Sequence, residues 1–140
     1  MSEANDFNQG VIEEFRANDG VVGGPFQGFQ LVLLHHIGAK SGTERINPLA
    51  YQRLGDDSVA IFASKGGAPT NPDWFHNLVA NPKTRIEIGT EQYDVTARVA
   101  AGDERERIWE AQKKAFPNFA EYETTAGDRK IPVVVLDKAT

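Results

Sequence analysis

Short apolar segments separated by tight turns constrain the fold of this 140-residue chain more than any other feature. Strand-like segments are predicted at residues 31–34, 45–54, 58–64, 84–88, 93–99 and 131–136. Hairpin turns are predicted at Gly55-Asp56-Asp57 and Gly89-Thr90-Glu91. Because short turns join strands that run in opposite directions, the sheet is predicted to be mostly antiparallel, and a closed or split barrel would remove its exposed edges.

Helices are predicted before the first strand, between the third and fourth strands, and before the last strand. Residues 5–18 place several apolar side chains on one helical face, namely Phe7, Val11, Ile12 and Phe15. Asn71 is predicted to cap the second helix with Pro72 in its first position, and Asp103 and Glu106 fit a capping box. A short helical segment is expected over residues 118–124. The order predicts a single α+β domain over residues 1–140, in which residues 1–20 form an N-terminal helix.

The composition excludes several classes of protein. The chain has no cysteine, which rules out a disulfide scaffold, a cysteine-ligated metal site and thiol catalysis, so any redox chemistry must come from a bound cofactor. Its net charge of −5 disfavours nonspecific nucleic-acid binding. The first residues lack the pattern of a signal peptide and no apolar run is long enough to span a bilayer, so a cytoplasmic location is expected. A peripheral membrane contact through the N-terminal helix stays open, although its acidic flank disfavours anionic lipid.

Two basic, glycine-rich turns are the strongest candidates for a binding site. Residues 36–85 carry a net charge of +2 within an acidic chain. The first turn presents Lys40, Ser41 and Arg45, and the second turn, Ser64-Lys65-Gly66-Gly67, leads into the second helix. Cations, hydroxyls and free backbone N–H groups suit a phosphate or a carboxylate, and the N-terminus of a helix favours an anion. The alternative is a pair of solvated surface turns.

Other polar and aromatic residues carry weaker signals. His35 and His36 are predicted to point to opposite faces of one strand and, with His76, show no metal-binding spacing, so no metal site is predicted. Trp74 suits either the wall of a cofactor site or the core. Tyr122, expected in an irregular segment, is either a hydrogen-bond donor to a substrate oxygen or a surface aromatic residue.

Taken in order along the chain, several segments resemble one known family. This family is the deazaflavin-dependent nitroreductases, small actinobacterial reductases that use coenzyme F420. The similar segments cover nearly the whole chain. They are Val11 to Arg16, Gly23 to Phe26, Lys40 to Gly42, Arg45, Asn47 to Leu49, Ala63 to Gly67, Asn71 to Leu78, Ala80 to Pro82, Glu104-Arg105, Trp109 and Ile131 to Val134.

The resemblance implies a split β-barrel and a deazaflavin site. In such a site the phosphate and the acidic tail of coenzyme F420 would be held by Lys40, Ser41, Arg45 and Lys65. The residues along the deazaflavin would be Ile46, Asn47, Pro48, Leu49, Phe62, Ala63 and Ser64, completed by Asp73, Trp74, Phe75, His76 and Asn77. Ser64 and Tyr122 would act as catalytic residues that hydrogen-bond the acceptor.

The chain departs from the family pattern at three positions. Ala39 stands where an arginine often precedes the lysine of the first turn, and Ala50 and Phe119 stand where some relatives carry tyrosine. These departures imply that the anionic tail would lack one anchor and that the pocket would be wider. For this reason the resemblance does not imply reduction of nitroimidazole compounds.

The resemblance implies an oxidoreductase that passes a hydride from reduced coenzyme F420 to an electron-poor acceptor. The acceptor would be a small hydrophobic molecule such as an activated alkene, an unsaturated lactone, a quinone or a nitro compound. The protein would orient the reactants while the cofactor supplies the chemistry. Two alternatives remain, an FMN-binding oxidoreductase of the same barrel class and a non-catalytic carrier that binds the deazaflavin.

Overall fold

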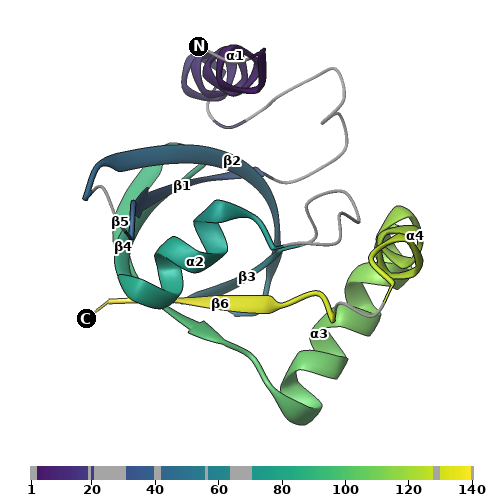
Figure 1. Ribbon diagram of the computed structural model, residues 1–140. Helices are drawn as coiled ribbons and strands as arrows, with labels where there is room; N and C mark the ends of the chain where they lie inside the picture. The colour runs from purple at the N-terminus through teal and green to yellow at the C-terminus, as the bar shows by residue number, and fades with distance from the viewer. Residues whose placement is uncertain are drawn as a thin grey trace.

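The predicted order of elements is present in a computed structural model that describes residues 3–18, 20, 31–39, 42–55, 57–63, 71–127 and 130–139, with side chains from residue 9 onward. The elements are α1 (Glu3–Ala17), β1 (Leu31–Ile37), β2 (Glu44–Arg53), β3 (Ser58–Phe62), α2 (Asp73–Ala80), β4 (Lys83–Ile88), β5 (Glu91–Val99), α3 (Gly102–Ala115), α4 (Asn118–Thr125) and β6 (Val133–Lys138). Figure 1 shows the strands wound into a ring, with helices at its mouth and around it.

The described strands form a closed barrel in the order β1-β2-β3-β6-β5-β4, and every neighbouring pair is antiparallel. The ring closes between β1 and β4, where Leu34 is paired with Ile86. The predicted antiparallel α+β barrel is therefore confirmed. Because successive side chains of a strand point to opposite faces, each strand serves both the interior of the barrel and an outer surface.

Apolar side chains fill the interior of the barrel. Val32 and Leu34 of β1 are completely buried there. The other buried residues of this interior core are Val59, Ile61, Ala63, Ile86, Val95, Val134 and Leu136, together with Trp74 and Leu78 from α2. The helix α2 is thus part of the interior packing, and it closes one end of the barrel.

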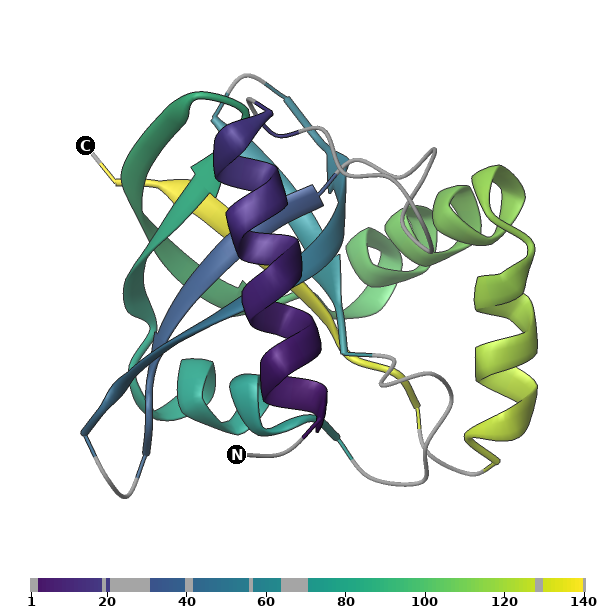
Figure 2. The same cartoon turned by 90° about the horizontal axis from the view of Figure 1, so that it is seen from above.

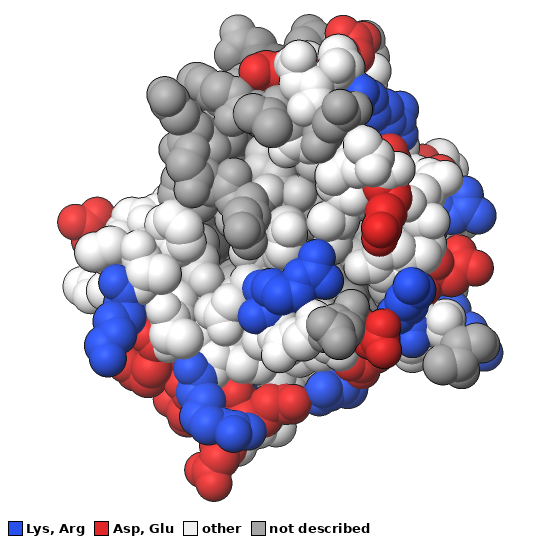
Figure 3. Space-filling model, turned by 180° about the vertical axis from the view of Figure 1, so that it is seen from behind, with Lys and Arg blue, Asp and Glu red and all other residues white. Residues whose placement is uncertain are grey.

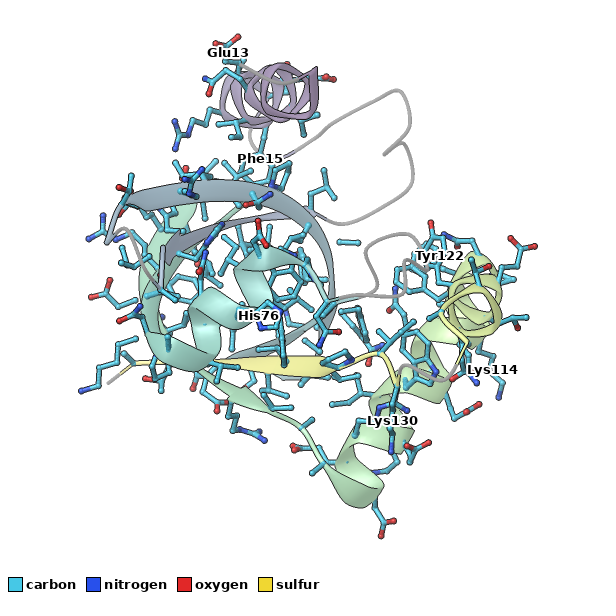
Figure 4. The ribbon with its side chains drawn as sticks, in the orientation of Figure 1. Glu13, Phe15, His76, Lys114, Tyr122 and Lys130 are labelled. Atoms are coloured by element: carbon cyan, nitrogen blue, oxygen red, sulfur yellow. The ribbon has the colours of Figure 1, made fainter. Side chains whose placement is uncertain are left out.

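On the outside of the barrel, α1 lies across β1 and β2 (Figure 2). Its residues Val11, Ile12 and Phe15 are buried against Leu31 and Leu33, which alternate along β1 with the interior residues. Figure 4 shows Phe15 pointing toward the barrel and Glu13 pointing away from it. The predicted apolar face of the first helix is therefore used in packing.

A chain of ionic contacts joins α1 to the barrel. Arg16 donates hydrogen bonds from Nε (3.1 Å) and Nη2 (2.7 Å) to the two carboxylate oxygens of Glu87 on β4. Glu87 Oε2 also lies 2.7 Å from His35 Nε2, and His35 Nδ1 lies 3.1 Å from Glu44 Oε1. The Arg16 guanidinium, with a further contribution from His35, holds the pKa of Glu87 below its usual range. Glu87 is therefore a carboxylate at neutral pH and pairs with α1.

A separate core lies between the barrel and the α3–α4 pair. Here Phe62 of β3 contacts Trp109 and Phe119, with ring centroids 5.9 and 5.6 Å away. The buried Arg105 donates from Nη2 to the carbonyl oxygen of Ile131 at 2.7 Å, which ties α3 to the start of β6. Packing and this buried hydrogen bond together hold the two helices on one side of the barrel.

The starts of two helices differ from the sequence prediction. The N-cap of α2 is Pro72 rather than Asn71, and its first helical residue is Asp73. The N-cap of α3 is Ala101, so the predicted capping box is wrong. The prediction fails because the helix begins at Gly102, which places Asp103 inside the first turn rather than at the N-cap. The carboxylate of Glu106 instead lies 3.0 Å from Arg105 Nη1 and 3.5 Å from Lys130 Nζ.

The short helical segment expected over residues 118–124 is present as α4, so only the expectation that Tyr122 lies in irregular chain is wrong. Tyr122 lies within α4, half-buried, and its hydroxyl oxygen accepts a hydrogen bond from Asn118 Nδ2 at 3.0 Å. Its ring packs edge-on against Phe119, with centroids 5.2 Å apart. The apolar contact of Phe119 with the α3 side stabilises the helix, and this long-range contact could not be seen in the local sequence.

Replacing Phe15 by alanine tests the packing of α1. Phe15 is 1% exposed, so Phe15→Ala should lower the free energy of unfolding by about 3–5 kcal/mol. The matched control is Glu13→Ala on the exposed face of the same helix, which should change it by less than about 0.5 kcal/mol. Urea unfolding measures both. Equal, small effects would contradict the docking of α1 on β1.

The Arg16–Glu87 pair gives a pH-dependent prediction. Arg16→Met should lower the free energy of unfolding by about 0.5–1 kcal/mol at pH 7, a range reduced for the exposure of Arg16. Since the pKa of Glu87 is lowered in the folded state, this stabilisation is present above its unfolded pKa and is lost as the pH falls through the folded pKa. In a Glu87→Gln background, Arg16→Met should have almost no effect. An undiminished effect there would rule out the pairing.

Candidate functional site

The candidate site lies where α2 closes the barrel. Figure 1 looks at this end and shows α2 across the mouth of the ring, and Figure 2 shows the same helix at one end of the barrel. Trp74 and Leu78 point from α2 into the interior core, while Asp73 and His76 are exposed. The helix therefore presents an apolar face to the barrel and a polar face to solvent.

A set of hydrogen bonds links β1, β2, α2 and the first turn at this end. His36 Nε2 lies 2.6 Å from Asn47 Oδ1, and His36 Nδ1 lies 2.9 Å from Asn77 Nδ2. The amide oxygen of Asn77 accepts the backbone N–H of Ala39 at 2.9 Å. His36 is 2% exposed and Asn77 is 8% exposed, so these bonds are shielded from water. They fix α2 to the turn that begins at Gly38.

The electrostatic surroundings of His36 favour a neutral ring. Burial lowers the pKa of His36, and it outweighs the hydrogen bond to Asn47, which raises the pKa. Arg45 and His35 lower the pKa further, while Asp73 raises it. A neutral imidazole can donate from one nitrogen and accept at the other, which matches its two amide neighbours.

The ends of the first basic turn are closed by backbone hydrogen bonds. The N–H of Gly38 bonds to the carbonyl oxygen of Thr43, and the N–H of Gly42 bonds to that of Gly38, both at 2.9 Å. Gly42 has a φ of +70°, which favours glycine, and a side chain there would meet open space. Lys40 and Ser41 of this turn lie outside the described residues, as do Ser64 and Lys65 of the second turn. Arg45 is described and is exposed at the start of β2.

The structure brings some of the predicted site residues together at this end of the barrel. Asn47 and Asn77 both bond to His36. Ala63 and Trp74 belong to the interior core, and Leu49 and Phe75 pack against it. These six residues surround or adjoin the junction of α2 with the barrel.

Other predicted site residues lie elsewhere. Ile46 packs on the outer core beneath α1, and Phe62 belongs to the core beneath α3 and α4. Pro48 is buried on β2 and pairs with Leu33. Figure 4 shows Tyr122 on α4, well apart from His76 on α2. The described residues therefore do not bring Tyr122 to the α2 end of the barrel.

His36 is the residue that sequence reasoning missed. Its spacing predicts no metal site and indicates no other role, but the predicted alternation along β1 is confirmed, with His35 outside the barrel and His36 inside. The sequence does hold one indication of a buried role for His36, because it follows Val32 and Leu34 in the same alternation along a buried strand. Its asparagine partners could not be found from spacing, because Asn77 is 41 residues away in the sequence.

Two hollows flank this region. One of about 280 Å³ is mainly apolar and lies between α2 and β5, lined in part by Phe75, Val79 and Val99. The other, of about 660 Å³, is lined by charges of both signs, including Lys83, Arg85, Glu44 and Asp94. On the face opposite to α2, acidic and basic side chains are interspersed, and the described residues form no continuous basic surface in that view (Figure 3).

The helices have one further property in common. Within the ranges that the structure describes, each helix is too short or too polar to cross a lipid bilayer.

Comparison with known proteins gives a consistent set of relatives. An F420H(2)-dependent quinone reductase of Mycobacterium tuberculosis is 37% identical over 128 residues, which cover 89% of this chain and 85% of that protein. A solved structure of an F420-H2 dependent reductase, FDR-A, is 41% identical with a TM-score of 0.69 and covers 76% of this chain and 93% of its own. Another solved structure, described as a domain-swapped dimer, is 35% identical with a TM-score of 0.71 and covers 96% of this chain and 100% of its own.

The family assignment follows from the match over most of the chain. The family described as F420H(2)-dependent quinone reductase matches residues 9–138. The predicted class of reductase dependent on reduced coenzyme F420 is thereby confirmed, whereas the nitroreductase label is not. The chain belongs to the F420H(2)-dependent quinone reductase family.

Proposed function

We propose that this protein transfers a hydride from reduced coenzyme F420 to a quinone or another electron-poor organic acceptor. The observation that carries the proposal is the meeting of Asn47, Leu49, Trp74 and Asn77 at the α2 end of the barrel. These residues were expected to line the deazaflavin. The quinone-reductase names of the relatives support the acceptor class.

The chemistry of the residues at this end suits coenzyme F420. A flat deazaflavin ring needs apolar walls, which Leu49, Trp74 and Phe75 offer as buried or partly buried side chains. An anionic tail needs cations, and Arg45 is exposed beside the closed turn at Gly38 to Thr43. When bound, the reduced cofactor supplies the hydride.

The chain itself would bind and orient the reactants. We assign the phosphate and acidic tail to Lys40, Ser41, Arg45 and Lys65, in the two basic turns. The deazaflavin would lie along residues 46–49 and 62–64, with 73–77 completing the site. Ser64 and Tyr122 would donate hydrogen bonds to the acceptor, and for Tyr122 this requires an acceptor that extends from the α2 end of the barrel toward α4. Asn118 donates to the Tyr122 oxygen, so the phenolic hydrogen is free to point to another acceptor.

Several finer points belong to the same proposal. Nitro compounds, activated alkenes and unsaturated lactones are further acceptors to test. An FMN-dependent reaction and a carrier without turnover are the competing functions, and comparing the affinity for coenzyme F420 with that for FMN separates them. A dimer is suggested by the relative described as a domain-swapped dimer.

A peripheral membrane contact through α1 receives little support. The apolar residues Val11, Ile12 and Phe15 are buried against the barrel and are not free to enter a lipid surface. Contact would require release of the helix from the barrel. Co-sedimentation with vesicles would measure it directly.

The activity is tested by mixing the purified protein with reduced coenzyme F420 and a panel of quinones. Recovery of the absorbance of oxidised F420, dependent on both protein and quinone, is the expected result. Turnover of no acceptor despite tight F420 binding would favour the carrier. A preference for FMN would favour the flavin alternative.

Charge-removal variants test the anion site. Lys40→Ala, Arg45→Ala and Lys65→Ala should each weaken binding of coenzyme F420 by about 3- to 30-fold, because each removes a charge-assisted hydrogen bond at a solvent-facing site. Lys114→Ala is the matched control, since this lysine is exposed on α3 (Figure 4). Fluorescence titration measures the affinities. Equal affinities for all four variants would refute the assignment of the anion site.

Removal of one hydroxyl tests the role of Tyr122. Tyr122→Phe should lower kcat for a quinone by about 10-fold or more while leaving F420 affinity almost unchanged, because the hydroxyl would act on the acceptor. Tyr93→Phe on β5 serves as the control. If both variants turn over like the wild type, Tyr122 is not a catalytic residue.

A further inference from the structure

The hydrogen bonds around His36 form one continuous chain across four segments. The chain runs from Asn47 on β2 through His36 on β1 to Asn77 on α2 and ends at the backbone N–H of Ala39. Its three distances are 2.6, 2.9 and 2.9 Å. Ala39 immediately precedes Lys40 in the sequence, so the chain ends next to the first basic turn.

The direction of these bonds follows from the chemistry of the groups. A backbone N–H can only donate, so the Asn77 atom that faces Ala39 must be the amide oxygen. The other end of the amide is then the NH₂ group, which donates to His36 Nδ1. His36 Nδ1 must carry no proton, and its neutral ring donates from Nε2 to Asn47 Oδ1. Only this arrangement satisfies all three bonds.

Protonation of His36 would break this arrangement. A charged imidazole donates from both nitrogens, so Nδ1–H would face the NH₂ group of Asn77. If the amide rotates to offer its oxygen to His36, its NH₂ group then faces the N–H of Ala39. In both cases two hydrogen-bond donors face each other. The hydrogen bond between the Ala39 N–H and Asn77 is then lost or strained.

Charged groups on several elements influence the protonation of His36. Arg45 on β2 and His35 on β1 disfavour a proton on the ring, and Asp73 on α2 favours one. On β4, the other neighbour of β1, Arg85 pairs with Asp94 and Glu87 pairs with Arg16. Burial is the largest influence and keeps the ring neutral at neutral pH.

We propose that His36 is a positioning residue whose neutral ring orients the Asn77 amide so that its oxygen holds the Ala39 N–H, at the start of the turn to which we assign the anionic cofactor tail. This inference rests on the proposed function, because it assigns the tail of coenzyme F420 to that turn. Asn77 would thereby influence cofactor binding through its hydrogen bond to the backbone N–H of Ala39. Affinity for the tail becomes dependent on the protonation of a residue that does not touch it.

The first measurement needs no cofactor. In the wild-type protein, the ¹⁵N shifts of the His36 ring should show a neutral Nε2–H tautomer at pH 7.5, and the Ala39 amide should be protected from exchange. As the pH falls and His36 gains its proton, that protection should drop. An Nδ1–H tautomer, or an Ala39 amide that exchanges freely at pH 7.5, would overturn the proposal.

The second measurement is the affinity for oxidised coenzyme F420 between pH 7.5 and pH 4.5. His36 with a lowered pKa is neutral at the upper end, so wild-type affinity should fall by about 3- to 10-fold as the ring becomes charged. His36→Asn offers an oxygen near the position of Nδ1 and cannot become charged, so it should bind with a flatter pH profile. His35→Gln, a change on the outer side of the same strand, should keep a profile as steep as that of the wild type, with its midpoint moved to slightly higher pH because His35 lowers the pKa of His36.

The outcomes separate this inference from the proposed function. A His36→Asn profile as steep as that of the wild type would overturn the positioning role even if F420 binds. Failure of every form to bind F420 would overturn the proposed function and the role in binding, whereas the ring and amide signals would still decide whether the Asn77 arrangement exists. Where His36→Asn does not fold, the wild-type ring and amide measurements decide the proposal.

Discussion

The alternation of side chains along β1 determines how the barrel interior, α1 and α2 pack together. Leu31, Leu33 and His35 face outward, while Val32, Leu34 and His36 face inward. The outward residues pack against α1 and take part in the ionic contacts that join α1 to the barrel. The inward residues fill the barrel interior and make the polar contacts with α2. A shift of one residue in register would exchange these two sets and leave both cores with the wrong side chains.

The polar groups at the α2 end are tolerable because each has a partner. Removing an imidazole and two amides from water without partners would cost several kcal/mol, comparable to much of the net stability of a small domain. Asn47, Asn77 and the Ala39 N–H supply those partners at hydrogen-bond distance. The same contacts restrict the position of α2, which apolar packing alone would fix less precisely. In this way a stabilising contact also sets the geometry of a candidate binding turn.

The sequence was informative where local periodicity decides the structure. The order of elements, the antiparallel barrel and the opposite faces of His35 and His36 follow from strand alternation and short turns. The α3 start was not predictable from its capping pattern, because Gly102 begins the helix one residue before Asp103. The helix over residues 118–124 was expected, but its packing through Phe119 against Trp109 and Phe62 was not, and the Asn77–His36–Asn47 contacts exist only once the barrel is closed. The two basic turns stay a prediction from sequence at Lys40, Ser41, Ser64 and Lys65.

Binding of coenzyme F420 at the α2 end of the barrel underlies both the proposed function and the role of His36. It is tested most directly by adding oxidised F420 to ¹⁵N-labelled protein and following the backbone amide signals, with FMN as the comparison ligand. We expect F420 to shift the signals of Ala39, Arg45, Asn47 and residues 73–77 far more than those of α3, and to do so at lower concentration than FMN. Shifts confined to α3 and α4, or a stronger response to FMN, would contradict it.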